Sequence, residues 1–506
     1  MAKKILILGT SNSLISGGWV DGLKASNNSF EIYNKSIGAS PGIQFAAHID
    51  TDFSAYDYVF FDSIPNDEQY QYESSGYSDL EFSTSVLRDL FSAIAAETRL
   101  IVLGICNKNY FDEESQVYSV RRALAGFCNS EFIDVRSILQ RCEDFFVRRS
   151  GVRELYDVHP SHPLPQHMKL VGYLIGRELN DRQEDKFPLN TKRPAYSNWI
   201  AAENTHHDYS VVEKKNSLLC EKFAILPDGA QLVFPEEKRC LGFYINFYGT
   251  DASVLLENLA TGSSRSIRLF NKTSEKLLKL FVPIPNGERS LRLAVRNGCG
   301  KDCYTPVVFS KKPIKSEKPV LQISHVVFQD SDSESIGCLE DFIKKFSCQK
   351  SVMTESLIAQ VKKLQQKFPV APEHGLTDSR GRSILYSLSQ NKCFAIFPSI
   401  FPENQSDLYP VFVRARDQEA RLFVVIEGSD FLLSAYHNSI SIAASAILKA
   451  KQPVGEKIGI NAFTVSDGDR GFSLLYGGMY ASSLPDGRLV VNRQEAKAWE
   501  VFYLKL

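Results

Sequence analysis

The first 180 residues alternate short apolar runs with segments of helical spacing, and this alternation limits the possible folds most. Residues 5–8 (ILIL), 58–61 (YVFF) and 100–103 (LIVL) are apolar runs of strand length. Apolar residues between them recur at helical spacing, as in Val86, Leu87, Leu90, Phe91 and Ile94, and again in Val117, Val120, Leu124 and Phe127. Strands that alternate with helices favour a parallel sheet. We therefore predict a three-layer, flavodoxin-like α/β domain over residues 1–185.

A serine follows the first predicted strand, at the sheet edge where α/β folds place their chemistry. The strand ends at Gly9, and Ser11 comes two residues later. A hydroxyl is a poor nucleophile unless a base and oxyanion donors converge on it. Taken alone, Ser11 also suits a helix N-cap or a phosphate-binding loop.

Two later segments offer donors for an oxyanion. Gly38 follows the stretch 30–33, and its unhindered backbone N–H can approach a reacting oxygen. Asn66 follows the strand 58–61, where we expect a loop. The side-chain amide of Asn66 can donate a hydrogen bond to an oxyanion from such a loop. Each residue has an ordinary structural alternative, since Gly38 can serve a positive φ and Asn66 a turn.

Histidines near the end of this domain are the candidate bases. His159 lies two residues after Asp157, and His162, like His159, precedes a proline, while His167 lies close by. We favour His159, because a neighbouring carboxylate can fix the tautomer of the imidazole. His162 is the alternative base, and a purely structural loop histidine is the alternative for His159.

The order of these residues resembles the SGNH hydrolase family, also called GDSL-like esterases, over about 180 residues. The resemblance implies that Ser11 is the nucleophile and that Gly38 and Asn66 donate to the oxyanion together with the Ser11 N–H. It also implies that His159 is the base and Asp157 its orienting acid.

Two positions depart from the family pattern. Thr10 stands where the family usually has aspartate. The family spaces its acid and base as Asp-x-x-His, whereas a single residue separates Asp157 from His159. This shorter spacing leaves the choice between His159 and His162 open.

Composition excludes several functional classes. The net charge of −1 gives no overall electrostatic attraction to nucleic acid. The sequence contains no run of about eighteen apolar residues, which is the length that a membrane-spanning helix needs. The apolar segment before Gly9 is too short for the core of a signal peptide, so we expect a cytoplasmic location.

The ten cysteines predict neither a disulfide framework nor a metal site. None forms a Cys-x-x-Cys pair, so reduced thiols are expected. Only Cys299 and Cys303 lie close in sequence, and His206, His207 and Asp208 form a similarly isolated cluster. We therefore predict no metal and no bound cofactor.

Residues 198–312 read as short strands separated by turns, after a polar stretch between Asp181 and Asn198 that we interpret as a linker or a domain edge. Residues 224–226 and 231–234 flank Pro227-Asp228-Gly229 and predict a hairpin. About seven such strands indicate an antiparallel, jelly-roll-like β-sandwich. A glycan-binding module and a scaffold for the active-site cleft are equally good interpretations.

Residues 320–372 predict a strand at 320–328 followed by two helices, and we interpret this segment as a connector. Apolar residues at helical spacing mark each helix, namely Leu339, Phe342, Ile343 and Phe346, then Leu357, Val361, Leu364 and Phe368. We expect these faces to be buried against a neighbouring domain rather than to bind a partner.

Residues 380–506 contain an internal repeat. Phe423, Phe463 and Phe502 occupy equivalent positions spaced by 40 and 39 residues. Three all-strand units of this length predict a β-trefoil, with the phenylalanines as one layer of its core. Residues 485–502 resemble the fascin-like trefoil family, which implies binding of glycans or protein surfaces. Tyr476 and Tyr480 suit packing as well as a sugar site.

Together, these parts resemble a carbohydrate-directed esterase or O-acyltransferase. The resemblance implies acyl transfer or removal on a cell-surface polysaccharide, as in capsule biosynthesis, through an acyl-enzyme. Transfer would use acetyl-CoA or another acyl donor as a co-substrate. The alternative is a catalytically degenerate protein that binds or assembles glycans. The sequence does not indicate an oligomeric state.

Overall fold

The structure is a computed structural model that describes most of residues 2–367 and, beyond them, ten strands between residues 385 and 504. Outside the described residues up to 367 lie 28, 75–78, 144–145, 147–154, 157–158, 182–194, 205–208, 217–218, 272–275, 300–302, 307, 310–315, 334 and 348–350. The predicted linker and the cluster from His206 to Asp208 fall almost entirely in these gaps.

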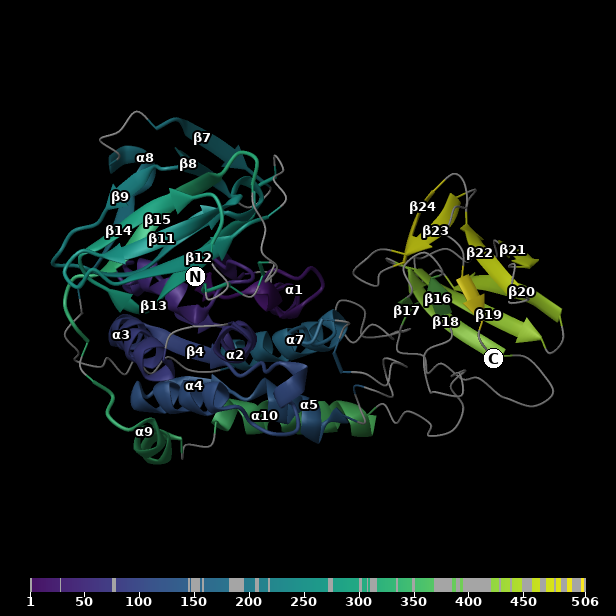
Figure 1. Ribbon diagram of the computed structural model, residues 1–506. Helices are drawn as coiled ribbons and strands as arrows, with labels where there is room; N and C mark the ends of the chain where they lie inside the picture. The colour runs from purple at the N-terminus through teal and green to yellow at the C-terminus, as the bar shows by residue number, and fades with distance from the viewer. Residues whose placement is uncertain are drawn as a thin grey trace.

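A five-stranded parallel sheet forms the centre of the N-terminal part, as the alternation predicts (Figure 1). Its order is β2-β1-β3-β4-β5, with bounds Glu31–Asn34, Lys4–Leu8, Tyr58–Phe61, Arg99–Leu103 and Glu131–Ile133. Successive side chains of a strand point to opposite faces, and every residue from Ile5 to Leu8 is buried. Both faces of the sheet are therefore covered. The order also places the segments after β2, β1 and β3 next to one another.

Helices that cover the sheet contact one another in two groups. One group holds α1 (Trp19–Ser26) and α7 (Pro165–Asp181), and α10 (Val352–Lys367) contacts both α7 and α5 (Val135–Arg141). The other holds α2 (Ile64–Glu73), α3 (Leu80–Glu97) and α4 (Gln116–Phe127). None of the described helices is long and apolar enough to cross a bilayer.

Glycines allow α1 and α7 to approach closely, and this predicts a large loss of stability on substitution. A Cβ at Gly172 would lie 1.9 Å from the Trp19 carbonyl oxygen, and one at Gly22 would lie 1.9 Å from the Lys169 carbonyl oxygen. We expect Gly172→Ala to lower the free energy of unfolding by about 3 kcal/mol, because the two helices must separate. Urea unfolding measures this. A smaller loss is expected for Gly176→Ala, whose Cβ would meet the side chain of Ser26 rather than backbone.

Two antiparallel sheets pack on each other in the next part, which confirms antiparallel strands after the α/β sheet. The larger sheet has the order β13-β10-β15-β8-β7, with β6 on β15; the bounds are Lys279–Glu288, Arg239–Asn246, Val320–Gln329, Cys220–Pro227, Val211–Lys215 and Tyr196–Ile200. The smaller sheet has the order β12-β11-β14-β9, with bounds Ser264–Leu269, Ala252–Asn258, Leu291–Arg296 and Gln231–Val233. Buried apolar side chains from both sheets form a shared core.

The predicted hairpin around Pro227-Asp228-Gly229 is wrong. A turn forms there, since the Ala230 N–H donates to the Pro227 carbonyl, but β8 pairs with β7 and β15 whereas β9 pairs with β14. The turn therefore carries the chain from one sheet to the other. Buried side chains on both strands, such as Leu226 and Leu232, meet in the core between the sheets, and this packing overrides the local hairpin signal.

The predicted connector over residues 320–372 also needs correction. Its strand, β15, is a central strand of the larger sheet, where it pairs with β10, β8 and β6. The next helices, α9 (Leu339–Phe346) and α10 (Val352–Lys367), pack on the N-terminal part, as expected for buried apolar faces. The ring of Phe127 in α4 contacts Phe342 and Phe346 of α9.

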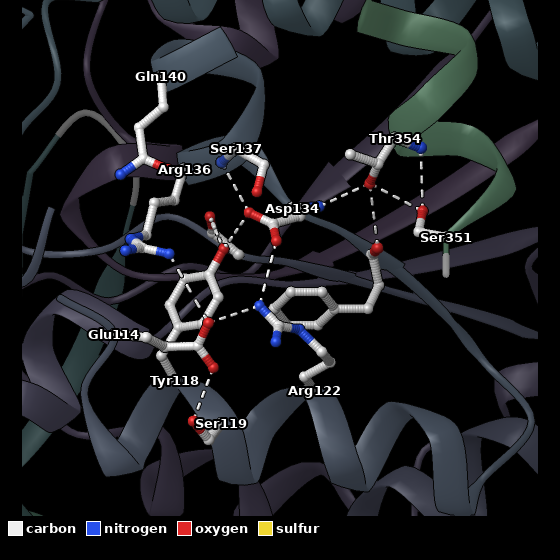
Figure 2. A network of polar contacts seen from close by, with 12 residues as sticks. Glu114, Tyr118, Ser119, Arg122, Asp134, Arg136, Ser137, Gln140, Ser351 and Thr354 are labelled. Carbon is white, nitrogen blue, oxygen red and sulfur yellow. Dashed lines mark hydrogen bonds and ion pairs between the residues drawn. The ribbon is translucent and has the colours of Figure 1, made fainter. Parts of the chain in front are cut away.

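Helix α10 is fastened to the end of β5 by hydrogen bonds, as Figure 2 shows. The Asp134 N–H donates to Thr354 Oγ1 at 2.9 Å, and Thr354 Oγ1 donates to Ser351 Oγ. Asp134 also accepts from Tyr118 and from Arg122, which in turn pairs with Glu114. A segment that follows the sandwich in sequence thus returns to complete the α/β unit.

The described residues of the C-terminal part form antiparallel strands. They run from β16 (Leu385–Ser387) and β17 (Lys392–Phe394) through β18 (Ala420–Ile426), β19 (Ser429–Tyr436), β20 (Ser439–Ile447), β21 (Lys457–Thr464), β22 (Arg470–Tyr476), β23 (Met479–Ser483) and β24 (Leu489–Arg493) to β25 (Phe502–Leu504). Phe423, Phe463 and Phe502 lie in β18, β21 and β25. The trefoil stays a prediction.

Candidate active site

Ser11 lies directly after β1, where it begins the short 3-10 helix η1 (Ser11–Ser13) and is half-buried. Three hydrogen bonds hold this turn at its third residue. Ser13 Oγ donates to Asp62 Oδ2 at 2.9 Å, Trp19 Nε1 donates to Ser13 Oγ, and Asn34 Nδ2 donates to the Ser13 carbonyl at 2.8 Å. The turn that carries Ser11 is therefore held to Asp62 after β3, to Trp19 of α1 and to Asn34 of β2.

The imidazole that contacts Ser11 is that of His162. Its Nε2 lies 2.8 Å from Ser11 Oγ, within hydrogen-bond distance. The two residues are 151 positions apart in sequence. A serine hydroxyl and an imidazole nitrogen at this distance can exchange a proton.

The preference for His159 is not supported by this geometry. The His159 side chain is exposed, and its Nδ1 accepts from the Ser161 N–H at 3.2 Å. Its ring stacks on that of His162 with centroids 4.4 Å apart. His159 was favoured because of Asp157, which lies outside the described residues. A turn in which the His162 N–H donates to the His159 carbonyl sets which ring faces Ser11, and no local sequence rule predicts this.

If His162 is the base, the Asp-x-x-His pattern places the acid three residues before it. His159 stands three residues before His162, which is the position of the acid in the Asp-x-x-His pattern. Counting back from His162 therefore reaches a histidine that stacks on it rather than a carboxylate.

Two asparagines that sequence reasoning missed hold the loop of His162. Asn12, beside Ser11, donates from Nδ2 to the Ser161 carbonyl at 3.0 Å. Asn107, which follows β4, donates from Nδ2 to Ser161 Oγ at 3.1 Å. The Lys108 N–H adds a 2.7 Å bond to the Pro160 carbonyl. These contacts tie the histidine loop both to the turn of Ser11 and to the carboxyl end of β4.

Gly38 lies against Ser11. A Cβ at Gly38 would be 3.7 Å from Ser11 Cβ, and the Ile37 N–H donates to the Gly9 carbonyl at 3.0 Å. Gly38 does not have a positive φ, so that alternative role is wrong; Ala39 adopts it instead, with φ of 54°. The structure therefore brings the Gly38 backbone to the nucleophile.

Asn66 lies in the first turn of α2 and not in a loop as predicted. Its side chain is buried, and Nδ2 donates to the Ser40 carbonyl at 3.1 Å. A primary amide has two N–H donors, so one bond to Ser40 leaves the second for another acceptor. The helix arises because Pro65 suits the first turn and Ser63 precedes it.

Two buried carboxyl groups, Asp62 and Glu68, accept hydrogen bonds from segments that carry site residues. Burial raises the pKa of Asp62 to about 6, although Ser13 and the Thr10 backbone hydrogen-bond to it. Burial also raises the pKa of Glu68 to about 8, against the opposing effect of hydrogen bonds. Glu68 accepts from the Asn107 N–H at 2.7 Å and from Ser115 Oγ at 2.5 Å. Glu68 thus anchors the loop that holds the histidine turn.

The raised pKa of Glu68 predicts a specific pH dependence of stability. A carboxyl whose pKa rises from 4.5 to about 8 on folding contributes stability in full below pH 4.5, and this contribution is lost as the pH rises through 8. Glu68→Gln lacks this titration. We expect the free energy of unfolding of the wild type, relative to Glu68→Gln, to fall by about 1 kcal/mol per pH unit between pH 5 and 8. Parallel urea curves for the two proteins across this range would contradict the account.

Cys299 and Cys303 lie close together, apart from the site of Ser11. Their sulfur atoms are 3.2 Å apart, and Arg268 Nε donates to Cys299 Sγ at 3.2 Å. Among the residues that the structure describes, no three histidine, cysteine or acidic side chains group as a metal site.

The chain shows similarity to several solved structures. No protein-family model and no curated protein matches the chain. A two-domain esterase (CEX) active on acetylated mannans, co-crystallised with mannopentaose, is 12% identical at a TM-score of 0.42, over 66% of this chain and 92% of that one. A lipolytic G-D-S-L family member from Veillonella parvula DSM 2008 is 15% identical at a TM-score of 0.27, over 35% of this chain and 95% of that one.

The similarity to a third solved structure is lower still. CapF, a capsular polysaccharide assembling protein from Staphylococcus aureus, is 10% identical at a TM-score of 0.13, over 66% of this chain and 98% of that one.

Proposed function

We propose that the chain catalyses acyl-ester chemistry with Ser11 as nucleophile and His162 as general base. The observation that carries this proposal is the 2.8 Å contact between His162 Nε2 and Ser11 Oγ. His162 replaces His159, the base favoured from sequence. Asp157, outside the described residues, stays the proposed acid that orients the imidazole.

The reaction proceeds through a covalent acyl-enzyme. Ser11 Oγ attacks the carbonyl carbon of the ester while its proton moves to His162 Nε2, and the carbonyl electron pair moves to oxygen. The tetrahedral intermediate collapses, and the departing alkoxide takes the proton from His162. Water or a sugar hydroxyl then gives its proton to His162, attacks the acyl group, and releases Ser11 as the proton returns to it.

Three donors are proposed for the oxyanion, namely the backbone N–H groups of Ser11 and Gly38 and the second N–H of the Asn66 side chain. Gly38 lies against Ser11, and the Asn66 amide reaches Ser40, two residues beyond Gly38. Donors fixed before the reaction stabilise the developing charge at little reorganisation cost.

The substrate class that we propose is an acylated oligo- or polysaccharide. A site for ester chemistry next to a β-sandwich supports this choice, together with the repeat that predicts a glycan-binding β-trefoil. The same proposal includes a jelly-roll-like topology for the sandwich and a cytoplasmic location for the protein. It also includes acetyl transfer from a soluble donor such as acetyl-CoA during assembly of a cell-surface polysaccharide such as a capsule.

Acetate release tests the proposal. The purified protein is incubated with 4-nitrophenyl acetate and with acetylated manno-oligosaccharide, and Ser11→Ala serves as the control. We expect turnover that requires Ser11. Adding acetyl-CoA and unacetylated oligosaccharide, followed by mass spectrometry of the sugar, separates transfer from hydrolysis. Equal rates for both proteins would overturn the enzyme proposal and leave a protein that binds or assembles glycans.

A further inference from the structure

Loop 35–41, between β2 and the 3-10 helix η2 (Gly42–His48), carries Gly38 and is held along its backbone. Ser40 Oγ donates to the Gly38 carbonyl at 3.3 Å, and Tyr70 donates from its hydroxyl to the Ala39 carbonyl at 3.3 Å. Asn66 donates to the Ser40 carbonyl at 3.1 Å. Three consecutive carbonyls are thus hydrogen-bonded, and this fixes the peptide planes between them.

The β-sandwich supplies the next contact to this loop. The Phe281 N–H of β13 donates to Ser40 Oγ at 3.0 Å, and both residues are fully buried. Strand β13 lies at the edge of the larger sheet, where a strand has outward N–H groups without partners in the sheet. Ser40 satisfies one of them. A buried N–H that loses its acceptor costs about 1–3 kcal/mol, so the loop and the sandwich are coupled.

A second contact reaches the same loop through Gln44. The Tyr244 hydroxyl of β10 donates to the Gln44 carbonyl at 2.8 Å. Gln44, which is fully buried, donates from Nε2 to the Ile37 carbonyl at 3.5 Å. The Ile37 carbonyl and the Gly38 N–H belong to one planar peptide unit, so holding the carbonyl orients the N–H.

These two contacts come from neighbouring residues of the sandwich. Tyr244 and Phe281 are opposite each other in the β10–β13 pairing, and their rings pack at a centroid distance of 5.0 Å. A single cross-strand pair therefore touches both Ser40 and Gln44, the two residues that orient the peptides on either side of Gly38.

We propose that the β-sandwich is part of the catalytic centre, in which the Tyr244 hydroxyl and the Phe281 N–H hold loop 35–41 so that the Gly38 N–H points at the oxyanion. Tyr244, Ser40 and Gln44 are positioning residues, since none of them contacts the reacting atoms. This inference rests on the proposed function. A role of the sandwich in glycan binding alone would leave the chemistry on small esters unaffected by these residues.

The test compares two tyrosine hydroxyls that cross the same interface. Tyr244→Phe removes the hydroxyl that reaches Gln44, whereas Tyr196→Phe removes one that donates to Asp89 Oδ2 of α3 at 3.0 Å. We expect Tyr244→Phe to lower kcat about fivefold and Ser40→Ala to lower it about tenfold or more, since small misplacements of catalytic groups are costly. Tyr196→Phe should change kcat by less than about twofold.

The choice of substrate separates positioning from glycan binding. On 4-nitrophenyl acetate and on an acetylated oligosaccharide, Tyr244→Phe should lower kcat by the same factor with KM unchanged. Hydrogen exchange of the amides in residues 35–44 should be faster in Tyr244→Phe and in Ser40→Ala than in Tyr196→Phe. If Tyr244→Phe does not fold, Ser40→Ala carries the test.

Each failure has its own signature. Equal kcat and equal exchange in Tyr244→Phe and Tyr196→Phe, with an active wild type, overturn the inference alone. A drop in kcat/KM on the oligosaccharide only, with the small ester unaffected, also overturns it in favour of glycan binding. A wild type that turns over neither substrate overturns the proposed function, and the inference with it.

Discussion

Replacing His162 by alanine should lower kcat about 10³-fold, whereas replacing His159 should lower it less than about tenfold. Among the histidines that the structure describes, only His162 places a ring nitrogen within hydrogen-bond distance of Ser11 Oγ. His159 stacks on His162 and supports its ring, but its Nδ1 already accepts from the backbone of Ser161. Hydrolysis of 4-nitrophenyl acetate at saturating substrate measures both effects.

The two variants are matched controls for each other. Both variants remove an imidazole from the same turn of four residues. Each therefore abolishes the stacking contact between the rings of His159 and His162. Thermal unfolding should therefore change to a similar small extent in both proteins. A larger loss of kcat in His159→Ala than in His162→Ala would restore the assignment favoured from sequence.

Replacing Asn66 by alanine should lower kcat about 10²-fold with little change in KM, because a donor to the oxyanion acts in the transition state and not on bound substrate. The side chain is 3% exposed and comes from the first turn of α2, so its amide is held before the reaction. Steady-state kinetics on a small acetyl ester separates kcat from KM.

Asn198→Ala is the matched control for Asn66. Asn198 also donates from its side-chain amide to a backbone carbonyl, that of Ala47 in η2, at 2.9 Å. It has no contact with the loop of Gly38 among the hydrogen bonds described for it. We expect kcat of Asn198→Ala to stay within about twofold of the wild type. A raised KM with an unchanged kcat in Asn66→Ala would place Asn66 in substrate binding instead.

Much of the fold follows from sequence periodicity. Apolar runs such as 5–8 and 58–61 are strands because a parallel sheet covered on both faces buries every residue, and this makes the run continuous. The spacing in α3 and α4 likewise identifies their buried faces, with the exception of Phe127, which is 38% exposed. These signals are local, so a single sequence carries them.

Contacts across the chain are not predictable in the same way. The turn at Pro227-Asp228-Gly229 is correctly recognised, but its neighbours pair in different sheets because the core between the sheets decides. Strand β15 joins the sandwich from beyond a polar segment, and α10 returns to β5. Local sequence patterns do not predict which elements these segments pair with.

The candidate site shows the same division. The sequence predicts that Ser11 and Gly38 lie near each other because each follows a predicted strand, and the strand order brings them together. The choice between His159 and His162 depends on which ring a tight turn directs to Ser11, and the nearby Asp157 pointed to the wrong one of the two as the contact. Asn107 was missed because it acts through Ser161 rather than on Ser11.

The central claim is that His162 activates Ser11 for nucleophilic attack. A fluorophosphonate probe, which bonds covalently to activated serines, followed by peptide mass spectrometry, tests it most directly. The account predicts one modified residue, Ser11, no modification in Ser11→Ala, and at least about a hundredfold slower modification in His162→Ala than in the wild type. Modification of Ser11 at the same rate with and without His162, or of a different serine in the wild type, would contradict it.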